Sequence, residues 1–145
     1  MNRFAALALS AAILAPASAV TQPAFSADML RAAVSDDSVC SDAWVRRSIS
    51  SKFRYQVTHV PHLPDVSITD FRDVHLRRYM PASEKWPIAR TYCGAKVSLS
   101  DGMERSIWYF IEGGMGFAGI GDNVEFCVSG FDRWYVYDGA CRVAQ

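Results

Sequence analysis

Four cysteines are the residues of this chain whose chemistry is most definite: Cys40, Cys93, Cys127 and Cys141. An even number of cysteines in a short chain predicts a disulfide framework formed in an oxidising compartment. The chain has no Cys-x-x-Cys spacing and no histidine beside a cysteine, which argues against a zinc site. Cys127 and Cys141 flank an expected hairpin, so we predict that they pair, leaving Cys40 to pair with Cys93.

Two glutamates and one histidine are the candidates for acid–base chemistry. Glu112 and Glu125 stand at the two ends of a glycine-rich segment and could form a carboxylate pair. The alternative is a structural role in which these carboxylates pair with Arg105 or Arg133. His75 is the histidine considered for catalysis.

The histidines do not have the spacing of a metal site. His59 and His62 straddle Pro61, so they cannot present two imidazoles from one helical face, as a zinc site on a helix requires. We predict neither a metal ion nor a cofactor.

The glycine-rich segment from Gly114 to Gly119 matches the G-x-G-x-x-G pattern of dinucleotide-binding proteins. That function requires a helix directly after the glycines, and here a second strand is expected instead. We therefore predict a long hairpin loop over residues 113–122 that exposes Met115 and Phe117. Either these side chains contact a partner, or they fold back onto the sheet.

A second group of aromatic residues lies near the C-terminus. Trp134, Tyr135 and Tyr137 alternate along an expected last strand, preceded by Phe131 and Arg133. Trp, Tyr and Arg are enriched at binding hot spots, although aromatic residues on a sheet are also ordinary core. The candidate binding residues are thus Met115, Phe117, Phe131, Arg133, Trp134 and Tyr135.

The N-terminus has the three parts of a secretory signal peptide. Arg3 provides the positive charge, residues 4–15 are almost entirely apolar, and Ala17-Ser18-Ala19 provides small residues for cleavage. The apolar run is shorter than the roughly 20 residues needed to span a bilayer. We predict a signal peptide over residues 1–19 and a mature protein that begins at Val20, is periplasmic or secreted, and keeps no stable membrane anchor.

The composition is that of one folded domain. Half of the residues are hydrophobic, and 15 basic residues balance 15 acidic ones. A net charge of zero gives no electrostatic attraction to nucleic acid or to anionic lipid. We expect a loose lead-in over residues 20–38, with a short helical stretch from Met29 to Val34, and a single domain over residues 39–145.

One amphipathic helix is expected at the start of this domain, beginning at Ser41 or Asp42 and ending before Pro61. Ser and Asp can both cap a helix. Spacing by four residues places a stripe of apolar side chains on one face, which should pack on a sheet. The stripe consists of Val45, Ile49, Phe53 and Val57.

The rest of the domain is predicted to be an antiparallel meander of four or five strands. Residues 66–80 fit a long bent strand better than a helix, and residues 88–100, 104–112, 123–129 and 134–138 alternate as strands. The predicted fold class is therefore α+β, with one N-terminal helix packed on the sheet and two disulfides.

Asp101-Gly102 is a strong signal for a two-residue hairpin turn. That turn sets Cys93 opposite Phe110 and Ala95 opposite Trp108. It places Trp108 and Phe110 on the face that carries Cys93, Ala95, Val97 and Leu99, and puts Ile107, Tyr109 and Ile111 on the other face with Tyr92. A change of one residue in the loop would exchange the faces.

Several short motifs between Ile88 and Val143 resemble those of a family of small exported bacterial proteins of unknown function. The resemblance implies no activity. The order of one helix and a meander also resembles cystatin-like and NTF2-like folds, an analogy of architecture that does not indicate function. The motifs are Tyr92-Cys93-Gly94, Leu99-Ser100-Asp101-Gly102, Trp108-Tyr109-Phe110-Ile111-Glu112, Gly116-Phe117-Ala118-Gly119, Asn123-Val124-Glu125-Phe126-Cys127-Val128 and Cys141-Arg142.

The favoured interpretation is a small exported protein that binds a protein or small-molecule partner without catalysis, through the sheet aromatics and the glycine loop. The alternative is a small periplasmic hydrolase-like enzyme that uses Glu112, Glu125 or His75.

Overall fold

The computed structural model describes residues 37–145. The predicted signal peptide and the helical stretch expected at Met29–Val34 lie outside the described residues. The elements, in chain order, are α1 (Asp37–Ser41), α2 (Ala43–His59), β1 (Ile68–Met80), β2 (Arg90–Leu99), β3 (Glu104–Glu112), η1 (Phe117–Gly119), β4 (Asn123–Val128) and η2 (Arg142–Ala144).

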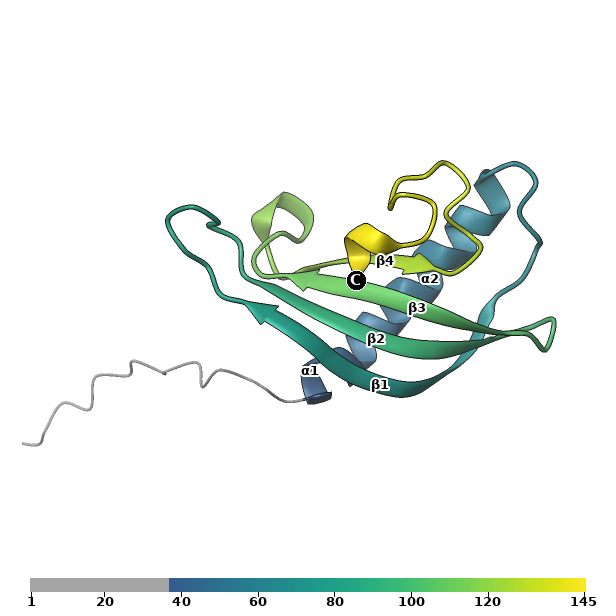
Figure 1. The fold of residues 1–145 in the computed structure, drawn as a ribbon, viewed down its shortest axis with the longest axis horizontal. Helices are drawn as coiled ribbons and strands as arrows, with labels where there is room; N and C mark the ends of the chain where they lie inside the picture. The colour runs from purple at the N-terminus through teal and green to yellow at the C-terminus, as the bar shows by residue number, and fades with distance from the viewer. Residues whose placement is uncertain (1–36) are drawn as a thin grey trace, which may run out of the picture. The chain divides into compact units, whose positions relative to one another are not determined.

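The four strands form one antiparallel sheet in the order β1-β2-β3-β4, and α2 crosses one face of it (Figure 1). The predicted α+β fold is confirmed. The short helix α1 precedes α2, so the main helix is not the first element.

Helix α2 forms where the apolar stripe predicted it. Val45, Ile49, Phe53 and Val57 are all buried against the sheet. Asp42 occupies the N-cap position, but its side chain makes no capping hydrogen bond. The helix ends at Val60, which is extended because a following proline disfavours helical backbone.

Both predicted disulfides, Cys40–Cys93 and Cys127–Cys141, are present. The first ties α1 to the central strand β2. Beside it, the Tyr109 hydroxyl donates a 2.7 Å hydrogen bond to the Cys40 carbonyl, and burial raises the pKa of Tyr109. Disulfides of this kind are typical of proteins that work in oxidising compartments. No helix within residues 37–145 is long and apolar enough to cross a membrane.

The register of the β2–β3 hairpin differs by one residue from the prediction. Cys93 lies opposite Tyr109, and Ala95 lies opposite Ile107. The loop has three residues because Gly102, with φ of +82°, adopts a left-handed conformation between the paired residues Leu99 and Met103.

This shift exchanges the faces of β3. Ile107, Tyr109 and Ile111 point toward α2 and are buried, whereas Trp108 and Phe110 lie on the opposite face with Tyr92. The predicted assignment of β3 side chains was therefore wrong.

The long strand predicted over residues 66–80 is present as β1, which begins at Ile68 and pairs with β2 with three register irregularities. One of them contains Asp73, whose φ is +52°. Each irregularity changes which face of the sheet the following side chains occupy. Phe71, Val74 and Leu76 can therefore all pack against the core although their spacing in the sequence does not alternate strictly.

The predicted fifth strand is absent from the described part of the chain: residues 134–138 form turns. The Asp132 carboxylate accepts hydrogen bonds from the backbone N–H groups of Tyr137 (3.0 Å) and Gly139 (2.7 Å). Side-chain bonds of this type compete with strand pairing. As a result β4 is an edge strand of the sheet.

Candidate ligand-binding groove

A pocket of about 550 Å³ lies beside the outer edge of β4. One wall is the C-terminal half of α2, and the other is the loop that follows β4, here called the C-terminal loop (residues 130–141). This loop returns beside β4 and α2 (Figure 1). The volume lies in the range that holds small ligands or side chains of a partner. We call this pocket the β4 groove.

The helical wall is an arc of α2 next to the buried stripe. It consists of Lys52, Tyr55, Gln56 and His59, whose spacing places them on one side of the helix. The Tyr55 and His59 rings are stacked, with centroids 3.8 Å apart, and the Tyr55 side chain is 65 % exposed. This wall therefore offers aromatic surface to a ligand.

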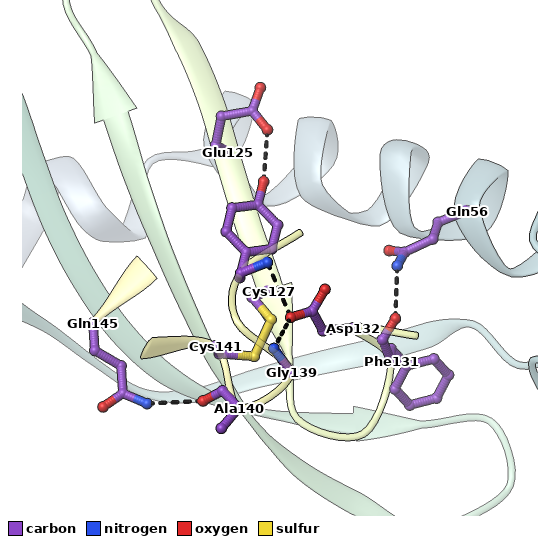
Figure 2. Close-up of a disulfide and its surroundings, with 10 residues drawn as sticks. Gln56, Glu125, Cys127, Phe131, Asp132, Gly139, Ala140, Cys141 and Gln145 are labelled. Carbon is purple, nitrogen blue, oxygen red and sulfur yellow. Dashed lines mark hydrogen bonds between the residues drawn. A yellow bond between two sulfur atoms is a disulfide. The ribbon is translucent and has the colours of Figure 1, made fainter. Parts of the chain in front are cut away.

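The opposite wall is held in place at several points. The Cys127–Cys141 disulfide closes the C-terminal loop onto β4, and Asp132 binds two of its backbone N–H groups (Figure 2). The Gln56 side chain donates a 2.9 Å hydrogen bond from α2 to the Phe131 carbonyl (Figure 2). The groove thus has two walls that are fixed relative to each other.

The predicted aromatic residues of this loop have different roles. Phe131 is buried, with its ring centroid 4.9 Å from that of Phe53, so its side chain belongs mainly to the core. Arg133 and Trp134 line the β4 groove, and the Trp134 side chain is 65 % exposed. Tyr135 instead lines a second pocket on the far side of the same loop, with His62.

Glu125 lies at one end of the groove in a hydrogen-bonded cluster. It accepts bonds from the Tyr137 hydroxyl (2.9 Å) and the Asn123 amide (3.0 Å), and the Lys52 ammonium is 3.9 Å away. Burial raises the pKa of Tyr137, and its hydrogen bond to Glu125 raises it further. The Tyr137 hydroxyl therefore acts as a donor that closes the loop onto β4.

Glu112 lies in the same cluster but is paired with Arg90 at 2.9 Å, and the Asn123 amide bridges toward it at 3.4 Å. The predicted partners Arg105 and Arg133 form no ion pair with either glutamate in residues 37–145, and Arg90 and Lys52 take their places. The carboxylates of Glu112 and Glu125 therefore both form ion pairs and accept hydrogen bonds from neighbouring side chains.

His75 lies on the sheet face opposite α2, outside the groove. Its Nδ1 atom is 2.7 Å from the Asp73 carbonyl, and its ring covers Gly94 so closely that a Cβ there would lie 2.8 Å from Nε2. Glycine is thus required at position 94 because the His75 ring leaves no room for a Cβ atom, and not because the chain turns there. The described part of the chain contains no cluster of three or more residues that could hold a metal ion.

Met115 and Phe117 belong to the glycine loop (residues 113–122) between β3 and β4, at the opposite end of β4 from the C-terminal loop. Phe117 is 96 % exposed and Met115 is about half exposed. The loop contains the 3-10 turn η1 and is closed by the Gly116–Gly121 backbone bond and by the Asp122 carboxylate, which accepts from Gly114 N–H. The structure therefore separates the predicted binding residues into two regions.

Sequence reasoning missed the helical wall, and it named Tyr137 as an aromatic residue of the last strand without including it among the candidate binding residues. The signal was present, because a polar and aromatic arc at positions 52, 55, 56 and 59 follows the helical repeat beside the apolar stripe. The sequence alone does not show that the C-terminal loop lies opposite this arc.

A comparison of the chain with family models, curated proteins and solved structures finds no match. Its function must therefore be inferred from its own residues.

Proposed function

We propose that this chain is an exported, non-catalytic binding protein, periplasmic or secreted, whose ligand lies in the β4 groove. The observation that carries this proposal is the exposure of Tyr55 and Trp134 on two walls that are held in place, the loop tied to β4 by a disulfide and to α2 by a hydrogen bond. Exposed aromatic side chains on a fixed backbone bind at a low cost in conformational entropy.

Export is supported by two independent features. The first residues have the pattern of a signal peptide, and the described domain contains two disulfides with no free cysteine. The mature protein would begin at Val20.

Binding is favoured over catalysis because the candidate acid–base groups are engaged. Glu112 is held by Arg90, and Glu125 accepts hydrogen bonds from Tyr137 and Asn123. A general acid or base needs a carboxylate that can reach a substrate proton. His75 lies outside the groove.

The experiment is a quantitative pull-down from periplasmic extract with the mature protein and two variants. Trp134→Ala removes an aromatic wall of the β4 groove, and Phe117→Ser removes the most exposed aromatic side chain of the glycine loop. We expect the partners that the native protein retains to be lost with Trp134→Ala and kept with Phe117→Ser. Loss with Phe117→Ser alone would place the binding site in the glycine loop, and retention by both variants would exclude both regions.

A further inference from the structure

The edge of β4 presents backbone hydrogen-bonding groups to the groove. In an antiparallel pair, alternate residues direct their N–H and C=O toward the neighbouring strand and the others direct them away. The bond from Ser129 N–H to the Ser106 carbonyl (2.9 Å) continues the β3–β4 ladder. Residues 124, 126 and 128 therefore direct their backbone groups away from β3.

Two contacts confirm this direction. The Lys52 ammonium donates to the Val124 carbonyl at 2.6 Å, and the N–H of Phe131 donates to the Val128 carbonyl at 3.0 Å. Both donors approach from the side of the strand that lacks a neighbour, so the carbonyls at the two ends of β4 are occupied.

Phe126 lies between these two ends and lines the β4 groove. Within residues 37–145, no hydrogen bond is formed by its outward N–H and C=O. A backbone donor and acceptor on one residue match the C=O and N–H of a single residue in an added antiparallel strand. Every residue of a peptide except proline presents this pair of groups, and alternate residues of an extended segment repeat it on the same edge.

From these groups we infer that the β4 groove binds an extended peptide segment of another protein, which adds to the edge of β4 as a fifth strand. This inference rests on the proposed function and specifies its ligand. Addition of a strand to a free sheet edge is a recurrent mode of peptide recognition, in which main-chain hydrogen bonds supply affinity and side-chain pockets supply specificity.

The walls of the groove fit such a strand. Side chains of a strand alternate between its two faces, so successive peptide side chains would meet α2 and the C-terminal loop in turn. Tyr55 lies on the first wall, and Trp134 and Val136 lie on the second, each of them 65 to 66 % exposed. We therefore expect a preference for apolar side chains.

The length of the segment is limited by the occupied carbonyls. Lys52 and Phe131 bind the carbonyls of residues 124 and 128, so the open edge is centred on Phe126. The whole stretch from residue 124 to residue 128 faces a segment of roughly five residues, of which the central one makes both hydrogen bonds to Phe126.

The test uses the mature chain, residues 20–145, and a library of acetylated, amidated pentapeptides with Val, Ile, Phe or Tyr at positions 2, 3 and 4, so that both walls meet apolar side chains, and Thr at positions 1 and 5. We expect library members to bind and to slow hydrogen exchange of the Phe126 amide at least tenfold. The amide of Asn123, which faces β3, serves as the internal control.

A scan of N-methylated versions of the tightest peptide provides the matched control. Methylation of the residue opposite Phe126 removes the N–H that its carbonyl accepts, and we expect binding to weaken about tenfold, the effect of one lost hydrogen bond. Methylation of the two adjacent residues, whose N–H groups point away from β4, should leave affinity within about twofold. Trp134→Ala should weaken the same peptide, and Tyr79→Ala, an exposed position on β1, should not.

Three outcomes would overturn the inference. Failure of every library member to bind, with pull-down ligands still lost in Trp134→Ala, would show that the groove takes a ligand other than an extended peptide. Equal effects of methylation at all positions would show that only side chains are recognised. Protection of the Phe126 amide that increases with protein concentration, without peptide, would assign the edge to a second copy of this chain. In the first two cases the proposed function stands.

Discussion

The two loops that flank β4 both expose apolar side chains but are built differently. The glycine loop exposes Phe117 and Ile120, and the C-terminal loop exposes Trp134 and Tyr135. The first is closed by hydrogen bonds between its own residues and is bonded to Ala89 at its first residue, Gly113. The second is joined to β4 by a disulfide and to α2 by Gln56.

This difference is the reason why we place the proposed binding surface at the C-terminal loop rather than at the glycine loop. Ordering a loop on binding costs conformational entropy for each residue that becomes fixed. The C-terminal loop is already attached at several points, so its aromatic side chains can contact a ligand at little further cost. Within the described chain, the glycine loop has neither a disulfide nor a side-chain bond to α2, and a bond from the Gly113 N–H to the Ala89 carbonyl (3.0 Å) holds only its first residue.

The strongest test of this contrast is Phe131→Ala. Phe131 anchors the start of the C-terminal loop in the core against Phe53, and removal of a buried Phe side chain costs about 3–5 kcal/mol. Chemical denaturation should show this loss of unfolding free energy. Trp134→Ala, three residues further along, should change it by less than about 0.5 kcal/mol. Similar losses for both variants would mean that the exposed and buried parts of the loop are not distinct.

Paired aspartate variants sharpen the comparison between the loops. Asp132→Ala removes the acceptor of two backbone N–H groups, and Asp122→Ala removes the acceptor of one. We expect losses of about 2 kcal/mol and about 1 kcal/mol, at roughly 1 kcal/mol for each hydrogen bond. In hydrogen exchange, Asp132→Ala should expose the amides of Tyr137 and Gly139 and leave the glycine loop unchanged. Equal losses would show that the two loops are held equally.

Alkaline pH should act on the C-terminal loop through Tyr137. Burial and the bond to Glu125 raise the pKa of Tyr137 above the value of about 10 that it has in the unfolded chain. The unfolded state therefore loses its proton first, so stability is maintained below about pH 10 and falls as pH rises above it. Tyr137→Phe should make the decrease in unfolding free energy between pH 9 and 11 shallower. Tyr109 contributes in the same direction, because burial raises its pKa as well, and it remains in this variant. An unchanged slope would contradict the role given to Tyr137.

The smallest effect is expected for Phe117→Ser. Its side chain is 96 % exposed, so the substitution should change the free energy of unfolding by less than about 0.5 kcal/mol. Thermal denaturation measures this directly. A loss of several kcal/mol would mean that Phe117 packs onto the domain and that the glycine loop is structural.

Most of the fold could be predicted from local patterns. The four-residue repeat of apolar side chains located α2, and alternation located the four strands. The hairpin register was missed because the left-handed conformation of Gly102 adds one residue to the loop. The last strand was predicted from the alternation of Trp134, Tyr135 and Tyr137. Sequence alternation does not show that the Asp132 carboxylate binds the backbone of this segment.

The groove was less predictable because it depends on contacts between distant parts of the chain. Arg133 and Trp134 were identified by residue type, since Trp and Arg are common at binding sites. Tyr55, Gln56 and His59 were not, because their role appears only when the C-terminal loop is placed against α2.

The position of the Cys127–Cys141 disulfide has a consequence for proteolysis. Residues 128–140 lie inside a covalent ring, so a protease that cuts at the exposed residues Trp134 or Val136 leaves the two pieces linked until the disulfide is reduced. The glycine loop lies outside both rings, since Cys40–Cys93 closes before it and Cys127–Cys141 begins after it. A cut beside Phe117 therefore leaves two chains held together by noncovalent contacts, chiefly the pairing of β3 with β4 and the packing of the core. A single cut in the C-terminal loop therefore leaves one covalently linked molecule, whereas a single cut in the glycine loop produces two separate chains.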